Sequence, residues 1–155
     1  MSKTIAIYCG SFKPYHIGHL NITEKAESIF GIGNVIISIG INPAKVENFN
    51  RETYINQAEE LSKKLNRKVE VYFTFLHEYI EEKEKEYNCN VVLIRGLRNG
   101  DDLNYEINQL RFIEDFKPDI KTIFIMCDKK FEHISSSSIK ILESFREGSS
   151  KQYTI

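Results

Sequence analysis

Two histidines stand three residues apart at the end of segment 10–19. A helical turn would place the imidazoles of His16 and His19 on one side, near the positive end of the helix dipole. Such a position binds phosphate readily, and Gly10 suits a tight turn at which the backbone approaches a ligand. The pattern therefore predicts a phosphate site. Two alternatives stay open at this point: ordinary surface histidines, or a zinc site, for which a third ligand is not evident nearby.

Positively charged residues follow two other apolar runs of the chain. Lys45 comes soon after the second run, and Arg95 and Arg98 flank a glycine after the fourth. Two arginines around a glycine can fork around separate phosphate groups. An ordinary strand-to-helix turn with Asp101 or Asp102 as N-cap would account for part of this segment, but not for the paired arginines.

Four consecutive serines, residues 135–138, follow the fifth run. Serine is a good helix N-cap, which alone would explain one or two of them. Four in a row also offer hydroxyls and free backbone N–H groups to an anion. We therefore interpret this segment as a further contribution to the phosphate site.

These residues need a scaffold that brings strand ends together. Continuous apolar runs, mostly rich in β-branched residues, predict five strands covered on both faces, at 5–8, 35–41, 69–73, 91–94 and 123–127. Amphipathic stretches between them predict helices at 18–30, 52–65, 76–87, 102–116 and 136–145. This alternation predicts one α/β domain over residues 1–155, with a doubly wound five-stranded parallel sheet. Ligands of such sheets bind beyond the carboxyl ends of the strands, which is where the charged residues occur.

Composition excludes several classes of protein. The chain has 155 residues, of which 41% are hydrophobic and 28% charged, as in an ordinary globular domain. A net charge of −1 and an isoelectric point near 6.4 argue against an extended surface for nucleic acid. No apolar run reaches the ~20 residues of a membrane span, and no signal-peptide core is evident. The three scattered cysteines indicate isolated thiols in a reducing compartment, so we expect a cytoplasmic protein.

Segment 10–19 resembles the His-x-Gly-His signature of the nucleotidyltransferase superfamily, in the form found in small adenylyltransferases. Class I aminoacyl-tRNA synthetases share this signature, but their further domains would need a much longer chain. The chain also resembles the bacterial phosphopantetheine adenylyltransferases, most specifically in residues 94–98 followed by Asp102, Tyr105 and Glu106. The Ile-Ser-Ser-Ser element at 134–137 is shared more widely among adenylyltransferases. The resemblance covers nearly the whole chain and implies a Rossmann-like nucleotidyltransferase fold. It also implies transfer of AMP from ATP to 4′-phosphopantetheine, giving dephospho-coenzyme A and pyrophosphate.

The same resemblance implies roles for individual residues. His19 would stabilise the transition state and, with Lys45 and Arg95, form the catalytic set. ATP would contact Ser11, Phe12, His16, His19, Gly96, Leu97, Arg98, Glu106, Phe131, Glu132, His133, Ile134, Ser135, Ser136 and Ser137. The acceptor would contact Ser11, Lys45, Leu76 and Arg95. The resemblance also implies Mg²⁺ held mainly by the ATP phosphates, without a protein metal ligand, and a homo-oligomer, which in the family is a hexamer.

The chain departs from the family pattern mostly on the acceptor side. Phe112 and Ile113 stand where the family has a Met-Asn pair of the pantetheine pocket, and Ile141 replaces a glutamate. Loop residues 13–16 also resemble those of nicotinamide-mononucleotide adenylyltransferases. The alternatives are therefore an adenylyltransferase with another phosphorylated acceptor, such as nicotinamide mononucleotide, or an ATP-binding paralogue that transfers nothing. The serine run resembles the ATP-binding form more than the cytidine form, and the sequence leaves open whether residues 147–155 fray or dock.

Overall fold

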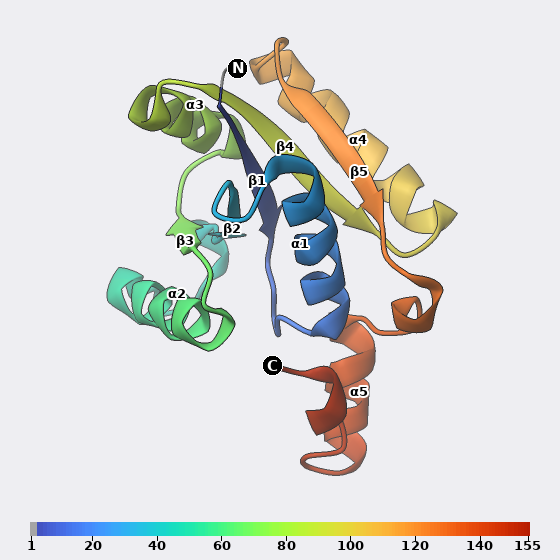
Figure 1. Ribbon diagram of the computed structural model, residues 1–155. Helices are drawn as coiled ribbons and strands as arrows, with labels where there is room; N and C mark the ends of the chain where they lie inside the picture. The colour runs from blue at the N-terminus through green and yellow to red at the C-terminus, as the bar shows by residue number, and fades with distance from the viewer. Residues whose placement is uncertain (1–2) are drawn as a thin grey trace.

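The computed structural model describes residues 3–155, in which strands and helices alternate (Figure 1). The five strands are β1 (Thr4–Gly10), β2 (Val35–Gly40), β3 (Val69–Tyr72), β4 (Asn90–Leu97) and β5 (Lys121–Met126). The α-helices are α1 (Ile17–Phe30), α2 (Arg51–Leu65), α3 (Leu76–Tyr87), α4 (Gly100–Phe116) and α5 (Ser136–Phe145). All strand pairs are parallel and the order in the sheet is β3-β2-β1-β4-β5. The predicted fold class is thus confirmed.

The central strand β1 is buried on both faces, as its unbroken apolar sequence predicts. Alternate residues point to opposite sides of the sheet, so Ala6 and Tyr8 pack with Ile22 of α1. Ile5 and Ile7 pack on the other side with Ile80 of α3. Burial of each such aliphatic side chain contributes roughly 1.5–3 kcal/mol. The apolar clusters on the two faces of the sheet together hold the carboxyl end of β1 in a fixed position.

The start of α4 differs from the prediction. Asn99, and neither Asp101 nor Asp102, is the N-cap: its side-chain oxygen accepts the backbone N–H of Asp102 at 3.1 Å. The helix therefore begins at Gly100, two residues earlier than its apolar periodicity predicts. With Asn99 in the capping position, the Asp102 carboxylate is available for another partner.

The strand order reverses between β1 and β4, which lie side by side although the chain visits β2 and β3 between them. A crevice opens at the carboxyl ends of the strands at such a switch point. Helices α1 and α5 begin near this point, and α5 and the C-terminal end extend from the sheet beside the start of α1 (Figure 1). No helix within residues 3–155 combines the length and the apolar character that crossing a bilayer requires.

Candidate active site

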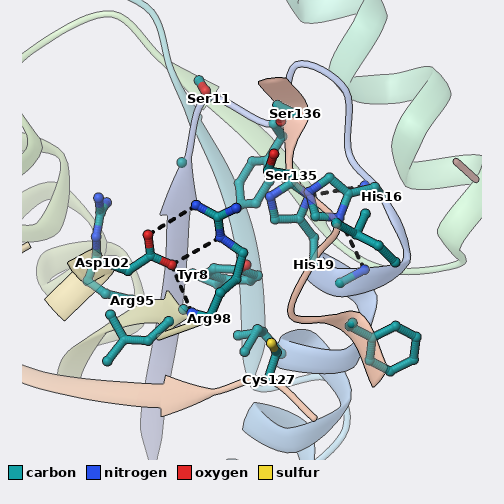
Figure 2. Close-up of a pocket in the computed structure, with 18 of the residues that line it drawn as sticks. Tyr8, Ser11, His16, His19, Arg95, Arg98, Asp102, Cys127, Ser135 and Ser136 are labelled. Carbon is teal, nitrogen blue, oxygen red and sulfur yellow. Dashed lines mark hydrogen bonds and ion pairs between the residues drawn. The ribbon is translucent and has the colours of Figure 1, made fainter. Parts of the chain in front are cut away.

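A cavity of about 470 Å³ lies at the carboxyl ends of β1, β4 and β5. Most of the residues singled out in the sequence line it: Ser11, Phe12, His16, His19, Arg95, Gly96, Leu97, Arg98, Glu106, Phe131, Ile134, Ser135, Ser136 and Ser137. Figure 2 shows the imidazoles of His16 and His19 side by side, next to Ser135. Chemical groups from segments more than 100 residues apart therefore face one space.

The histidine turn, residues 16–19, forms the first turn of α1 and satisfies its own backbone donors. His16 is the N-cap, and its Nδ1 accepts the Gly18 N–H at 3.1 Å. The His16 N–H in turn donates to Nδ1 of His19 at 3.0 Å. Because both Nδ1 atoms accept, each neutral ring carries its proton on Nε2. The rings stack at 3.6 Å, and Phe12 packs edge-on against His19 at 4.9 Å, so each tautomer and orientation is fixed.

Both imidazoles are neutral at physiological pH. Burial lowers the pKa of His16 to about 4, and the charge of Arg98 adds to this shift. Burial likewise places the pKa of His19 well below its usual value, with smaller contributions from His16 and Arg98. A neutral ring whose Nδ1 is already an acceptor can only donate from Nε2. The turn therefore presents hydrogen-bond donors, and no general base is needed to explain it.

Gly18 has no room for a side chain, because a Cβ there would lie 2.9 Å from Cε1 of His16 and 3.0 Å from its Nδ1. We expect Gly18→Ala to displace the His16 ring and to lower turnover about 10-fold, since misplaced catalytic groups lose much of their effect. Steady-state kinetics would measure this. Gly100→Ala is the matched control, because a Cβ at Gly100 meets nothing within 4 Å. Equal activity of both variants would contradict the role given to Gly18.

Arg95 projects from β4 and is held by two neighbours. Its Nε and Nη2 form a fork on the Glu106 carboxylate at 2.6 and 2.9 Å. Its Nη1 contacts the Cys9 Sγ at 2.9 Å and the Cys9 carbonyl oxygen at 3.3 Å. Four of the five donor hydrogens of the guanidinium are thus engaged, and one remains for an incoming anion.

Arg98 is arranged in the same way. Its Nε and Nη2 fork on the Asp102 carboxylate, both at 3.0 Å, and Asp102 also accepts the Arg98 backbone N–H at 2.9 Å (Figure 2). The sequence predicts arginine forks around phosphates, whereas in this structure both forks lie on carboxylates of α4. The positive charges at the cavity are therefore balanced, and a polyphosphate would either share these arginines or displace the carboxylates.

The serine segment forms the start of α5. Ser135 is the N-cap and forms a capping box with Ser138, whose backbone N–H it accepts at 3.0 Å. The hydroxyl of Ser136 donates to the carbonyl of Pro14 at 3.4 Å and so links this turn to the first one. Two of the predicted contacts in the preceding turn, Glu132 and His133, do not line the cavity. Two helix N-termini thus begin at the same cavity, which favours an anionic ligand.

A second cavity of about 300 Å³ adjoins the first and shares Arg95 and Glu106 with it. Leu76, Phe112 and Ile113 line this second cavity, so Leu76 and the two departures from the family pattern share one space. Lys45 lies in a 3₁₀ turn (Pro43–Lys45) after β2, where it is exposed and lines neither cavity. The structure therefore brings every predicted catalytic residue except Lys45 to the cavities.

Sequence reasoning missed several lining residues, among them Tyr8, Cys9, Tyr105, Asp102 and Cys127. Tyr8 and Cys9 belong to a strand that reads as uniformly apolar, so nothing in the pattern marks them. Asp102 and Tyr105 stand in the segment that carries the family resemblance, which is a signal that could have identified both. Asp102 also lies one helical turn before Glu106, on the same face of the helix.

The part of the chain from residue 3 onward contains no group of three or more His, Cys, Asp or Glu side chains that could hold a metal ion. The two carboxylates at the cavity, Asp102 and Glu106, are already forked on arginines. His16 and His19 accept backbone N–H groups through Nδ1, so a zinc site on this turn has no support.

Comparison with known proteins agrees with this geometry. A family model described as cytidylyltransferase-like matches residues 7–141. A phosphopantetheine adenylyltransferase of Clostridium novyi is 34% identical over 142 residues, covering 91% of this chain and 84% of the relative. One of Rhodopirellula baltica is 32% identical, covering 95% and 79%. The crystal structure of a putative nicotinate-nucleotide adenylyltransferase from Vibrio parahaemolyticus shares the fold, with a TM-score of 0.60, 15% identity, and coverage of 98% of this chain and 86% of that one. The chain therefore belongs to the cytidylyltransferase-like family of nucleotidyltransferase enzymes, among relatives named phosphopantetheine adenylyltransferase.

Proposed function

We propose that the enzyme transfers AMP from ATP to 4′-phosphopantetheine, which yields dephospho-coenzyme A and pyrophosphate. The observation that carries this proposal is the stacked, neutral histidine pair at the start of α1, which lines one cavity together with the start of α5. The adjoining cavity at Arg95 has the size and apolar lining for the acceptor's extended chain. The relatives' names support the same substrates.

In the proposed step an oxygen of the acceptor's phosphate attacks the α-phosphorus of ATP. A new P–O bond forms, the bond from the α-phosphorus to the oxygen bridging to the β-phosphorus breaks, and pyrophosphate leaves with that electron pair. The attacking oxygen is already an anion, so no base is required. Nε2–H of His19 would donate to an oxygen of the reacting phosphate, and Arg95 would hold the acceptor phosphate at the junction of the two cavities. Catalysis then consists of positioning and stabilisation of charge.

The charge balance of the cavity supports a divalent cation that arrives with the nucleotide. Arg95 and Arg98 are neutralised by Glu106 and Asp102, and both histidines are neutral. Mg²⁺ bound to the phosphate oxygens would supply the missing positive charge. Lys45, exposed in the turn after β2, would approach the phosphates only if that turn closes over the cavity.

An acceptor panel tests the proposal. We expect pyrophosphate release from MgATP with 4′-phosphopantetheine, and less than a tenth of that rate with nicotinamide mononucleotide, nicotinate mononucleotide or no acceptor. Release with a mononucleotide instead would favour the second candidate, an adenylyltransferase with another phosphorylated acceptor. The aromatic Phe112 in the acceptor cavity is the observation that keeps this candidate in view. ATP binding without pyrophosphate release under any acceptor would indicate a non-catalytic paralogue.

A further inference from the structure

The end of the chain returns to the histidine turn. Thr154 forms an isolated antiparallel bridge with His16, 138 residues earlier in the sequence. One residue before it, Tyr153 packs its ring edge-on against His133 at 6.2 Å, in the turn that precedes α5. Residues 148–155, here called the C-terminal clamp, therefore contact both the histidine turn at the cavity and the turn that precedes α5.

One side chain of α5 holds the clamp in its folded-back course. The Glu143 carboxylate accepts the backbone N–H groups of Gly148 at 3.0 Å and Ser150 at 2.8 Å, and the Ser150 hydroxyl at 2.6 Å. These hydrogen bonds lower the pKa of Glu143, so the carboxylate is charged at neutral pH. Ser149 adds a hydrogen bond to the Leu142 carbonyl at 2.7 Å, and Ser150 is buried. The clamp is a defined turn with satisfied polar groups and not a frayed end.

The bridge falls on the residue that fixes the His19 ring. His16 is 4% exposed, and its backbone N–H is the donor to Nδ1 of His19. A shift of the His16 backbone would break the hydrogen bond to Nδ1 of His19, and the His19 ring could then rotate or change tautomer. The contacts thus form one chain from Glu143 through the clamp to His16 and His19.

We propose that the C-terminal clamp is a positioning element for the reaction: it holds the His16 backbone where it can fix the orientation and tautomer of His19. The clamp does not itself touch the substrates. This inference rests on the proposed function only where it gives His19 the reacting phosphate; the geometry that it describes can be measured without any substrate.

Nuclear magnetic resonance of the unmodified protein and of a variant lacking residues 151–155 tests the geometry. In the unmodified protein we expect the Nε2–H tautomer of His19 and a His16 amide protected from hydrogen exchange. In the deletion variant we expect loss of that protection, by about 10-fold or more, and a mixture of His19 tautomers. Unchanged signals of both histidines in a folded deletion variant would overturn the proposal.

Kinetics separate positioning from simple destabilisation. Small displacements of catalytic groups can cost up to about 10²-fold in rate, so we expect kcat of the deletion variant to fall 10- to 100-fold while KM for ATP changes less than about threefold. If the deletion does not fold, Glu143→Gln decides in the same two measurements, with Glu147→Gln as the matched control. Glu147 lies in the turn that follows α5, is exposed, and has no side-chain hydrogen bond or ion pair within residues 3–155.

The two assays also keep the proposals apart. If the deletion variant shows the change of His19 tautomer but the unmodified protein has no measurable turnover, the proposal for the clamp stands and the proposed function is contradicted. Normal kcat together with disturbed histidine signals would contradict the role of the clamp in the reaction. A Glu143→Gln variant that leaves both the histidine signals and kcat unaltered would contradict the proposal that Glu143 acts on His16 and His19 through the clamp.

Discussion

Replacing His19 with alanine is expected to lower kcat by roughly 10²-fold or more and to change the affinity for ATP little. The ring is neutral, its Nδ1 accepts the His16 N–H, and only Nε2–H remains to donate. A donor that is fixed before the substrate arrives stabilises charge that develops on the phosphate in the transition state. The variant loses the acceptor of the His16 N–H, but Nδ1 of His16 still accepts the Gly18 N–H, so α1 keeps that half of its cap and the fold should survive. Pre-steady-state pyrophosphate release measures the rate of the chemical step, and equilibrium binding measures the affinity for ATP.

The matched control for this variant is His19→Gln, whose side-chain amide can place an N–H near the position of Nε2. We expect it to recover part of the lost turnover, since a neutral donor and not a charged imidazolium carries the effect. If the glutamine variant were as slow as the alanine variant while binding ATP normally, a specific role of the ring would be indicated. Turnover of His19→Ala within a factor of three of the unmodified enzyme would remove His19 from the mechanism.

Elements of this fold are predictable where burial alone decides them. Residues 5–8 of β1 and 91–94 of β4 are unbroken apolar runs, as expected for strands that helices cover on both faces of the sheet. The order of the runs along the chain implies parallel strands. Apolar periodicity places the start of α4 two residues late, because the first residues of the helix, from Gly100 to Asp102, are not apolar. Asn99 sets that boundary by a local hydrogen bond, which hydrophobic periodicity does not contain.

The site is predictable at the level of segments and not of contacts. Strand ends converge on one edge of a parallel sheet, so the order of apolar runs along the chain suffices to assign His19, Arg95 and Ser135 to one site. Which carboxylate engages each arginine depends on side-chain rotamers, and the docking of Thr154 on His16 depends on a turn around Glu143. Neither leaves a periodic signal. The magnesium ion, the homo-oligomer and the role of Lys45 stay predictions.

Arg95 raises the question whether a residue that supports the fold also acts in the reaction. Its fork on Glu106 is largely buried, with 23% and 14% of the two side chains exposed. Removal of one partner of such a pair leaves a buried, unpaired charge. We therefore expect Arg95→Met to lower the free energy of unfolding by about 3 kcal/mol, the lower end for a buried pair because some exposure remains. Urea denaturation measures this loss.

The double variant Arg95→Met with Glu106→Gln separates the two roles. It removes both charges, so we expect it to recover most of the lost stability, whereas turnover should stay about 10³-fold below that of the unmodified enzyme because no cation holds the acceptor phosphate. Arg111→Met is the control: it removes an arginine that also pairs with a glutamate of α4, but on the surface of the protein. Arg111 pairs with Glu114 at 2.9 Å but is 71% exposed, so this variant should change stability by less than about 0.5 kcal/mol and leave turnover unchanged. A double variant that regained both stability and turnover would mean that Arg95 only supports the fold, and the acceptor phosphate would then need a different cation, with Lys45 the first candidate.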